Sequence, residues 1–280
     1  MLPNLRAYHR PTSLEEAVQR IRPPAVVPLA GGTVLLPSRD PAVEEVVDLS
    51  GLGLTYIQVG EDGIHIGATT SLQHLLESPP LAEWTADCIG TVVRLTASRN
   101  LRGQATIGGM VMAGGPENPL LVFLLALDAG LTLYGPTPIR LSLDEFLNRR
   151  DEFRHRGVLI TELVVPYPGA LWGMGFAHVG RTPRDRPIVC AAAFLQQDGG
   201  LCRTARLVLG GVAERPLRAR EAEAFLRNRP LKPEEFRAAA RIAASPLRPP
   251  GDFRGSGEYR RAMAEVLARR ALEHARRNTK

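Results

Sequence analysis

Two glycine pairs in this sequence each stand beside a threonine, and they are the residues best suited to bind an anion. The first is AGGT at residues 30–33, and the second is TIGG at residues 106–109. Successive main-chain N–H groups in such turns form a concave anion site, and glycine lets a phosphate group come close. Two turns from distant parts of the chain would hold a pyrophosphate from both sides. The alternative is that both are tight turns at sheet edges, where glycine is common.

These turns do not belong to the common phosphate-binding motifs. No Gly-x-Gly-x-x-Gly fingerprint occurs, because Tyr56 stands where GLGLTY would need its third glycine. Neither lysine, Lys232 or Lys280, follows a glycine, so there is no P-loop. RGSGEY is not a nucleophile elbow, because Arg254 occupies the place of its first glycine. The glycines therefore need another explanation.

The cysteine and histidine content argues against a metal centre on this chain. Cys88, Cys190 and Cys202 form no Cys-x-x-Cys pair and are too few for a four-cysteine iron–sulfur cluster. The six histidines are scattered, with no pair at metal-ligand spacing. We expect no metal site, and we interpret Cys190, in the apolar IVCAAAF, as a small buried side chain.

The composition is that of an ordinary globular protein, with 280 residues, 44% of them hydrophobic and 23% charged. No apolar run approaches the roughly 20 residues that span a bilayer, and the first residues show no signal-peptide core. We therefore expect a cytoplasmic protein without a transmembrane segment. The net charge is +6, and 33 of the 35 basic residues are arginine. They are spread along the chain with few aromatic residues, which favours a solvated surface over a nucleic-acid interface.

The elements that must position the two turns follow from hydrophobic periodicity and from capping residues. Strands and helices are mixed rather than alternating as βαβ repeats, which favours an α+β fold. The expected elements are, in chain order, a helix at 12–21, strands at 25–30 and 43–50, a hairpin at 56–68, a helix at 70–78, a helix and strand at 120–135, a strand at 158–168, a hairpin at 187–213 and two closing helices, the last at 258–277.

The ordered set of motifs resembles the FAD-binding medium subunit of the molybdenum hydroxylases, a family that includes the carbon monoxide dehydrogenase medium subunit and the flavin domain of xanthine dehydrogenase. Its members carry Ala-Gly-Gly-Thr and, later, Gln-Ile-Arg-Asn-x-x-Thr-Ile-Gly-Gly-Asn. Here LAGGTVLLP at 29–37 is followed by NLRGQATIGG at 100–109. ARLVLGGVAERPLRAREAEAFL and EYRRAMAEVLARRAL are similar to the family's C-terminal domain. The resemblance covers nearly the whole chain.

The resemblance implies a two-subdomain FAD-binding module of the vanillyl-alcohol oxidase type, followed by a C-terminal α+β domain with an antiparallel sheet and helices. We expect the first subdomain at residues 1–56, the second at 57–170 and the C-terminal domain at 173–280. The glycine- and proline-containing PGALWGMG at 168–175 is interpreted as the boundary.

The resemblance also places the pyrophosphate of FAD between the two glycine turns. No catalytic residue is implied on this chain, because the flavin carries the chemistry. The implied cofactor-binding residues are Ala30, Gly31, Gly32, Thr33, Val34 and Leu35 on one side, Thr106, Gly108 and Gly109 on the other, and Ala113, Gly114 and His178.

Several polar positions of the family pattern are changed here. Met110 stands in place of the asparagine after Gly-Gly, Gly115 in place of a serine, Pro119 in place of an aspartate and His178 in place of a lysine. Main-chain contacts survive such changes, but side-chain contacts do not. The changes therefore predict weaker FAD binding by the isolated chain.

Two questions about the second turn stay open in the sequence. Glu117 or Asn118 could stand in for the lost polar groups. The pair Gly114 and Gly115 either keeps the backbone close to the cofactor or relaxes a site that has drifted.

The implied function is that of a flavin-dependent oxidoreductase subunit in a dimer of heterotrimers. In the family, a molybdopterin-binding large subunit hydroxylates the substrate, and a small subunit with two [2Fe–2S] clusters relays the electrons. FAD on the medium subunit then delivers them to an external acceptor, which could be a quinone, NAD or oxygen. The alternatives are a structural subunit that has lost or weakened FAD binding, a stand-alone FAD reductase on the same fold and a nucleic-acid-binding module. Arg181, Arg184 and Asp185 either form a surface ion-pair cluster or meet the flavin or a partner subunit.

Overall fold

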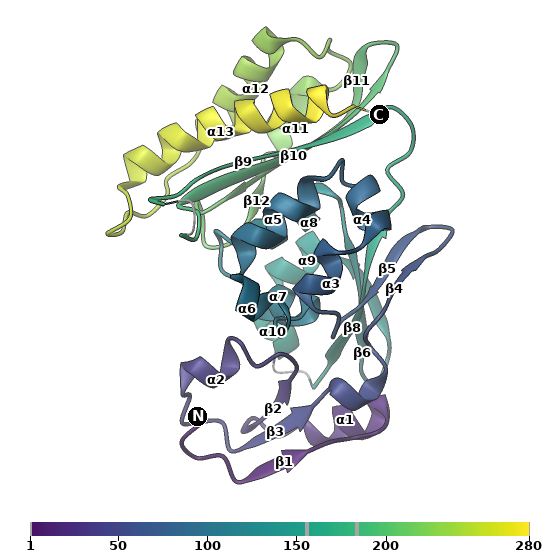
Figure 1. The fold of residues 1–280 in the computed structure, drawn as a ribbon. Coiled ribbons are helices and arrows are strands. Elements are labelled where there is room, and N and C mark those ends of the chain that lie inside the picture. The colour runs from purple at the N-terminus through teal and green to yellow at the C-terminus, as the bar shows by residue number, and fades with distance from the viewer. Residues whose placement is uncertain (1, 155–156, 183–184, 280) are drawn as a thin grey trace. The chain divides into compact units, whose positions relative to one another are not determined.

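The structure, a computed structural model, describes residues 2–154, 157–182 and 185–279. Its contacts group the chain into two units, each assembled from segments that are distant in the sequence (Figure 1). The chain crosses between the units several times, once directly between Gly114 and Gly115. The three-part division expected from the sequence stays a prediction. The first unit comprises Met1–Ser78, Ala97–Gly114 and Asp128–Pro166, and the second comprises Pro79–Thr96, Gly115–Leu127 and Tyr167–Lys280.

The first unit starts with a small parallel sheet in the strand order β1-β3-β2. The helix between β1 and β2 begins at Ser13, whose hydroxyl accepts a hydrogen bond of 3.2 Å from the N–H of Glu16. Ala17 on the apolar face of this helix packs with Val47 of β3. The elements are β1 (Ala7–His9), α1 (Leu14–Arg20), β2 (Val26–Leu29), α2 (Leu35–Ser38), β3 (Glu45–Asp48) and the 3₁₀ helix η1 (Ser50–Leu52).

The rest of the first unit is an antiparallel sheet in the order β4-β5-β8-β6-β7, with short helices. Its strands alternate buried and more exposed side chains, which is typical of a sheet with one covered face. The elements are β4 (Ile57–Val59), β5 (Gly63–Gly67), α3 (Leu72–Leu76), α6 (Arg99–Arg102), α7 (Ile107–Ala113), β6 (Gly130–Tyr134), β7 (Ile139–Ser142), α9 (Leu143–Asn148), α10 (Arg150–Arg154) and β8 (Leu159–Pro166).

The second unit is a three-layer arrangement around an antiparallel sheet in the order β12-β11-β10-β9. Three helices, α11, α12 and α13, cover one face, while α5 and α8 contact the other. This sheet with its helices confirms the expected antiparallel C-terminal domain, and the α+β fold class is confirmed. The elements are α4 (Pro79–Glu83), α5 (Cys88–Thr96), α8 (Pro119–Ala126), β9 (Trp172–Val179), β10 (Val189–Asp198), β11 (Leu201–Gly210), β12 (Leu217–Arg218), α11 (Arg220–Leu226), α12 (Pro233–Ala244) and α13 (Gly257–Arg277).

Two glycines of the expected boundary segment lie inside a strand instead. Gly173 and Gly175 belong to β9, and a Cβ atom on either would overlap the main-chain carbonyl oxygen of Ala275 or Ala271 in α13. Glycine is therefore needed here for the close approach of a helix to the sheet, not for a flexible connection. The boundary itself stays a prediction, and the sequence could not show the packing role of these two glycines, because a glycine cluster looks the same in both situations.

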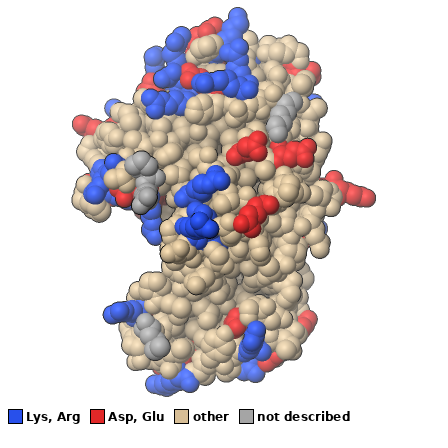
Figure 2. All heavy atoms as spheres, viewed as in Figure 1, with Lys and Arg blue, Asp and Glu red and all other residues tan. Residues whose placement is uncertain are grey.

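Two further features concern the hydrophobicity of the helices and the distribution of charge. No helix in the described ranges is long and apolar enough to cross a membrane. Lys and Arg side chains gather over α12 and α13, at the top of the view in Figure 2.

Candidate functional site: a glycine cradle in the first unit

The first glycine turn leaves a row of main-chain donors without partners. It follows β2 and precedes α2, and Gly32 adopts a left-handed conformation with φ of 66°. Within the described part of the chain, the N–H groups of Gly31, Gly32, Thr33 and Val34 donate no hydrogen bond to the protein. These residues are partly exposed, so a ligand can reach the donors. Such a row of N–H groups is suited to phosphate oxygens.

Gly31 brings the first turn into contact with the second. A Cβ atom at this position would overlap the carbonyl oxygen of Gln104, and it would come within 3.2 Å of the Cα atom of Ala105. The next residue in the chain is Thr106, at the start of the second turn. The first turn therefore contacts the two residues that precede the second turn, about 70 residues further along the chain.

Thr106 of the second turn caps a helix. Its hydroxyl oxygen accepts a hydrogen bond of 3.2 Å from the N–H of Gly109, and its carbonyl accepts one of 2.9 Å from the N–H of Met110. This is an ordinary N-cap for α7. The hydroxyl hydrogen of Thr106 makes no hydrogen bond with the described residues, so it can be donated to a ligand.

The remaining N–H groups at the start of α7 are also occupied. Ile107 donates to the carbonyl of Thr70 at 3.0 Å, and Gly108 donates to that of Ala68 at 2.9 Å. A Cβ atom at Gly108 would lie 2.8 Å from the same Ala68 oxygen, which explains the glycine. The second turn thus offers a hydroxyl group and space rather than the row of amides expected from its sequence.

The residues of the two turns fit a pyrophosphate group, but each turn would contribute different groups to its binding. The first turn can donate main-chain N–H groups, and Thr33 adds a hydroxyl. The second turn can donate the hydroxyl of Thr106 and, because Gly109 has no side chain, leaves the approach open. Val34 and Leu35 begin α2 behind the cradle.

The end of α7 holds the other two expected residues of this unit. Ala113 is exposed, whereas Gly114 is buried, and its carbonyl accepts a hydrogen bond of 2.7 Å from Arg150. The chain passes to the other unit directly after Gly114. The pair Gly114 and Gly115 therefore lies where the chain passes from one unit to the other, a role that neither interpretation of the sequence included.

His178 lies on β9 of the second unit and is half-buried. Burial lowers its pKa, so the ring is neutral at physiological pH and does not reproduce the charge of a lysine. Its inclusion among the FAD-binding residues stays a prediction.

The two polar residues considered as substitutes are engaged elsewhere. Asn118 caps α8 by accepting hydrogen bonds from the N–H groups of Leu120 and Leu121. Glu117 forms an ion pair of 3.3 Å with Arg254 in the second unit. Both side chains therefore have a structural explanation that needs no cofactor.

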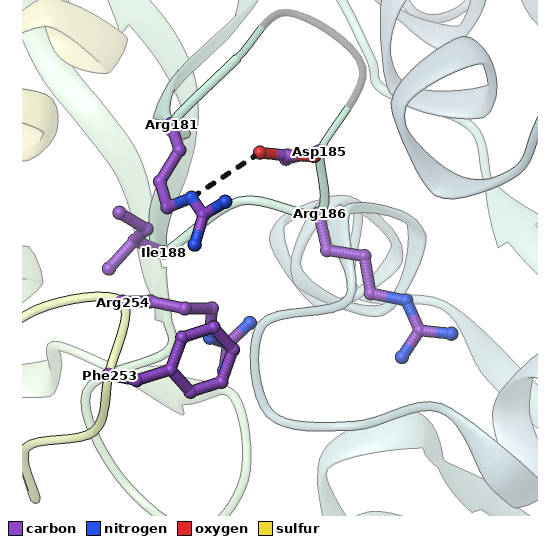
Figure 3. Close-up of a pocket in the computed structure, with 6 residues that line it drawn as sticks. All are labelled: Arg181, Asp185, Arg186, Ile188, Phe253 and Arg254. Carbon is purple, nitrogen blue, oxygen red and sulfur yellow. Dashed lines mark ion pairs between the residues drawn. The ribbon is translucent and has the colours of Figure 1, made fainter.

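The second unit contains a small arginine-lined cavity of about 280 Å³ (Figure 3). Arg181 lies 3.8 Å from Asp185, and its guanidinium carbon lies 5.9 Å from the centre of the exposed Phe253 ring. Arg254 points toward the same space. The ion pair between Arg181 and Asp185, one of the two interpretations considered for this segment, is present, whereas Arg184 lies outside the described residues.

Sequence reasoning missed a chain of polar side chains on the large sheet of the first unit. His65 lies 2.7 Å from Asp62 and 3.2 Å from Glu162, and the Tyr56 hydroxyl donates to Glu162 at 2.9 Å. The hydrogen bond with Asp62 raises the pKa of His65, with a further contribution from Glu162. Burial and Glu162 raise the pKa of Tyr56 to about 12. The alternation of polar residues in YIQVGEDGIHIGA could have indicated this cluster.

This cluster predicts a pH dependence of local stability. Because the folded pKa of His65 exceeds the unfolded value of about 6.5, its stabilising effect is complete below that pH and is lost as the pH rises through the raised folded pKa. We expect the hydrogen-exchange protection of β4 and β5 to fall by about 1 kcal/mol or less over this rise. His65→Gln should remove the dependence, while His74→Gln, at an exposed position, should keep it. An unchanged slope in His65→Gln would refute the assignment.

Comparisons with known proteins identify the family of the part of the chain that contains the glycine cradle. Residues 3–168 match the family described as the FAD binding domain in molybdopterin dehydrogenase. The chain belongs to the FAD-binding medium subunits of the molybdenum hydroxylases. Residues 175–275 match the CO dehydrogenase flavoprotein C-terminal domain, so both parts of this medium subunit are accounted for. The resemblance inferred from the sequence is confirmed, and the chain carries an FAD-binding domain.

Individual relatives of this medium subunit match along their whole length. It is 32% identical to the carbon monoxide dehydrogenase medium chain of Afipia carboxidovorans, covering 100% of both chains. It is 28% identical to the glyceraldehyde dehydrogenase medium chain of Sulfolobus acidocaldarius, covering 98% of this chain and 99% of the relative. A chain in the structure of the Hydrogenophaga pseudoflava carbon monoxide dehydrogenase superposes with a TM-score of 0.90 at 28% identity, with full coverage of both.

Proposed function

We propose that this medium subunit holds FAD in the glycine cradle and passes electrons from [2Fe–2S] clusters on a partner subunit to an external acceptor. The observation that carries this proposal is the row of unpartnered N–H groups at Gly31–Val34, packed against the turn that begins at Thr106. A phosphate at this position would satisfy donors that nothing in the described chain satisfies. Bound FAD would supply the redox chemistry, accepting electrons one or two at a time.

The chain's own contribution is binding and orientation. The amides of the first turn and the hydroxyl of Thr33 would hold one side of the pyrophosphate, and the hydroxyl of Thr106 the other. Gly109 would leave room for the phosphate to approach, and Ala113 and Gly114 would lie further along the cofactor. We name no general acid or base on this chain.

The proposed partners are a molybdopterin-binding large subunit and a small iron–sulfur subunit, in a dimer of heterotrimers in the cytoplasm. Support comes from full-length similarity to chains that are named as medium chains of dehydrogenases. Purification of the chain from its native source should bring both partners with it. Reduction of the iron–sulfur subunit should then bleach the flavin absorbance near 450 nm. Isolation as a free chain, or flavin that stays oxidised beside reduced clusters, would refute the proposal.

One observation favours the alternative of a subunit with weakened FAD binding. The amides at the start of α7 are satisfied internally, and Met110 offers no polar group where the family has asparagine. Pro119, in place of the family's aspartate, is buried at the first position of α8. Because these side-chain contacts are lost, the main-chain N–H groups of the first turn would supply most of the free energy of FAD binding.

We therefore expect the isolated chain to be recovered folded but with little FAD. Loss of polar partners at about 1–3 kcal/mol each predicts binding tens to thousands of times weaker than in a typical relative. Met110→Asn should tighten FAD binding about tenfold, measured by quenching of flavin fluorescence during titration. Met112→Asn on the same helix is the matched control and should have no effect. Adding Pro119→Asp to the Met110→Asn variant tests whether the loss of the family's aspartate also weakens FAD binding.

Two outcomes of this titration would separate the possibilities. Tight, stoichiometric binding of FAD by the unmodified chain would mean that the changes at Met110 and Pro119 do not weaken FAD binding. Absence of binding in Met110→Asn with Pro119→Asp, both alone and with partner subunits present, would favour the structural subunit.

A further inference from the structure

The positive charge of this chain is concentrated in its last segment. Residues 227–280 contain 14 basic and 6 acidic residues, whereas residues 1–226 contain 21 basic and 23 acidic residues. The segment therefore carries a net charge of +8, and the rest of the chain carries −2. The arginines are therefore not evenly spread along the chain, contrary to expectation, and the surface formed by this segment needs its own explanation.

That segment forms α12 and α13, whose buried sides pack on the sheet of the second unit. Phe236 and Leu267 lie in this core, so the outward sides are left to charged residues. Arg237 and Arg241 on α12 are exposed, as are Arg270 and Arg276 on α13. Figure 2 shows Lys and Arg gathered over these helices.

The exposed arginines are not neutralised by neighbours. Among the described residues, the side chains of Arg237, Arg241, Arg270 and Arg276 form no ion pair. Glu273, which lies near Arg276, is bound instead by Arg269 at 2.7 Å. Uncompensated cations repel one another, so this surface gains most from an external anionic group.

A groove runs between the start of α12 and the end of α13. It has a volume of about 430 Å³ and is lined by Pro233, Phe236, Glu273, Arg276 and Arg277. Arg276 therefore stands at a concave site beside the buried Phe236. Such a site can take a side chain that ends in a carboxylate.

The chemistry of this surface favours a protein partner over nucleic acid or lipid. Its cations are mostly arginines, which are enriched at protein interfaces and bind carboxylates with two parallel hydrogen bonds. Glu234, Glu235, Glu265 and Glu273 are interspersed among them, so the surface lacks the continuous positive charge that follows a phosphate backbone. The aromatic ring at the groove, Phe236, is buried and cannot stack on a base.

We propose that the α12–α13 surface, defined by Arg237, Arg241, Arg270 and Arg276 with the adjoining groove, binds an acidic segment of a partner subunit of the same complex. The proposal rests on the proposed function only for the existence of such a subunit. An acidic segment would neutralise the four arginines and place one carboxylate side chain in the groove beside Arg276.

The test is the double variant Arg270→Glu/Arg276→Glu, assembled with its partner subunits. Its matched control is Arg94→Glu/Arg203→Glu, which changes the net charge equally at exposed positions on α5 and β11. We expect the first variant to weaken association about tenfold or more near 0.15 M salt, and the loss to shrink near 1 M salt. Arg270→Lys/Arg276→Lys, which keeps the charge but removes the planar groups, should show a smaller loss. FAD titration of each isolated chain should be unaffected.

Several outcomes would overturn the proposal while leaving the proposed function intact. One is association of the Arg270→Glu/Arg276→Glu variant that equals the control at all salt concentrations. Another is loss, in that variant alone, of binding to duplex DNA, to phosphatidylserine vesicles or to a second copy of the chain, with subunit assembly unchanged. Failure of the unmodified chain to assemble with any partner would instead refute both proposals.

Discussion

Replacing Thr33 by glutamate is expected to weaken FAD binding about a hundredfold. The new carboxylate would stand within the row of N–H groups at Gly31–Val34 and repel the phosphate that they are proposed to bind. Two unit charges about 5 Å apart at an effective dielectric constant near 20 interact by about 3 kcal/mol, which corresponds to the stated factor. FAD titration of the isolated chain measures the effect, and the flavin content of the assembled complex checks it.

Thr33→Gln is the control, because it has the same size as glutamate without the charge. We expect it to bind FAD within a few fold of the unmodified chain. Equal affinities of the two variants would show that no phosphate lies at this turn. Substitution of Gly31 is a poorer test, since any side chain there would collide with Gln104 and disturb the contact between the turns.

Arg260→Ala is expected to destabilise the second unit by roughly 3 kcal/mol, the loss typical of a buried charged residue with several hydrogen bonds. The side chain of Arg260 is 5% exposed, and it donates to the carbonyls of Ile188 and Gly211, both at 3.0 Å. It also lies 2.7 Å from Asp252. Truncation would leave both carbonyls and the carboxylate without their shared donor. Urea unfolding followed by tryptophan fluorescence suits this test, because Trp84 and Trp172 both belong to the second unit.

The neighbouring Arg261 provides the control for this prediction. Arg261 is exposed on the same helix, so Arg261→Ala should change stability by no more than about 0.5 kcal/mol. Arg260→Lys keeps the charge but cannot reach all three partners, and we expect an intermediate loss. Equal unfolding midpoints for Arg260→Ala and Arg261→Ala would contradict the role assigned to this residue.

The longer elements of this fold could be predicted from the sequence because their signals are local. The hairpin of β10 and β11 has extended apolar strands around Asp198-Gly199-Gly200, and both glycines adopt positive φ. The last helix has a sustained apolar face and a serine cap at Ser256. The short helices α4, α6 and α7 span only four to seven residues, so periodicity has too few positions to identify them.

The candidate site could be predicted only in part, for a similar reason. Glycine pairs beside threonines indicated where the turns lie, but the sequence could not show which amides remain free. That depends on tertiary contacts, such as those of Ala68 and Thr70 with the start of α7. The collision that fixes glycine at position 31 likewise involves Gln104, far away in the chain. Glycine clusters therefore indicate close approach without identifying the approaching group.

The passages of the chain between the two units have a consequence for how this protein can be recombined. The segment Gly115–Leu127 lies before residue 168 in the sequence, yet it belongs to the second unit. Every residue of its helix α8 is buried, and the helix packs on β10 and β11. A fragment cut after residue 168 would leave this wholly apolar helix without its sheet. A functional chimera between two relatives must therefore exchange α8, together with Pro79–Thr96, as part of the C-terminal half.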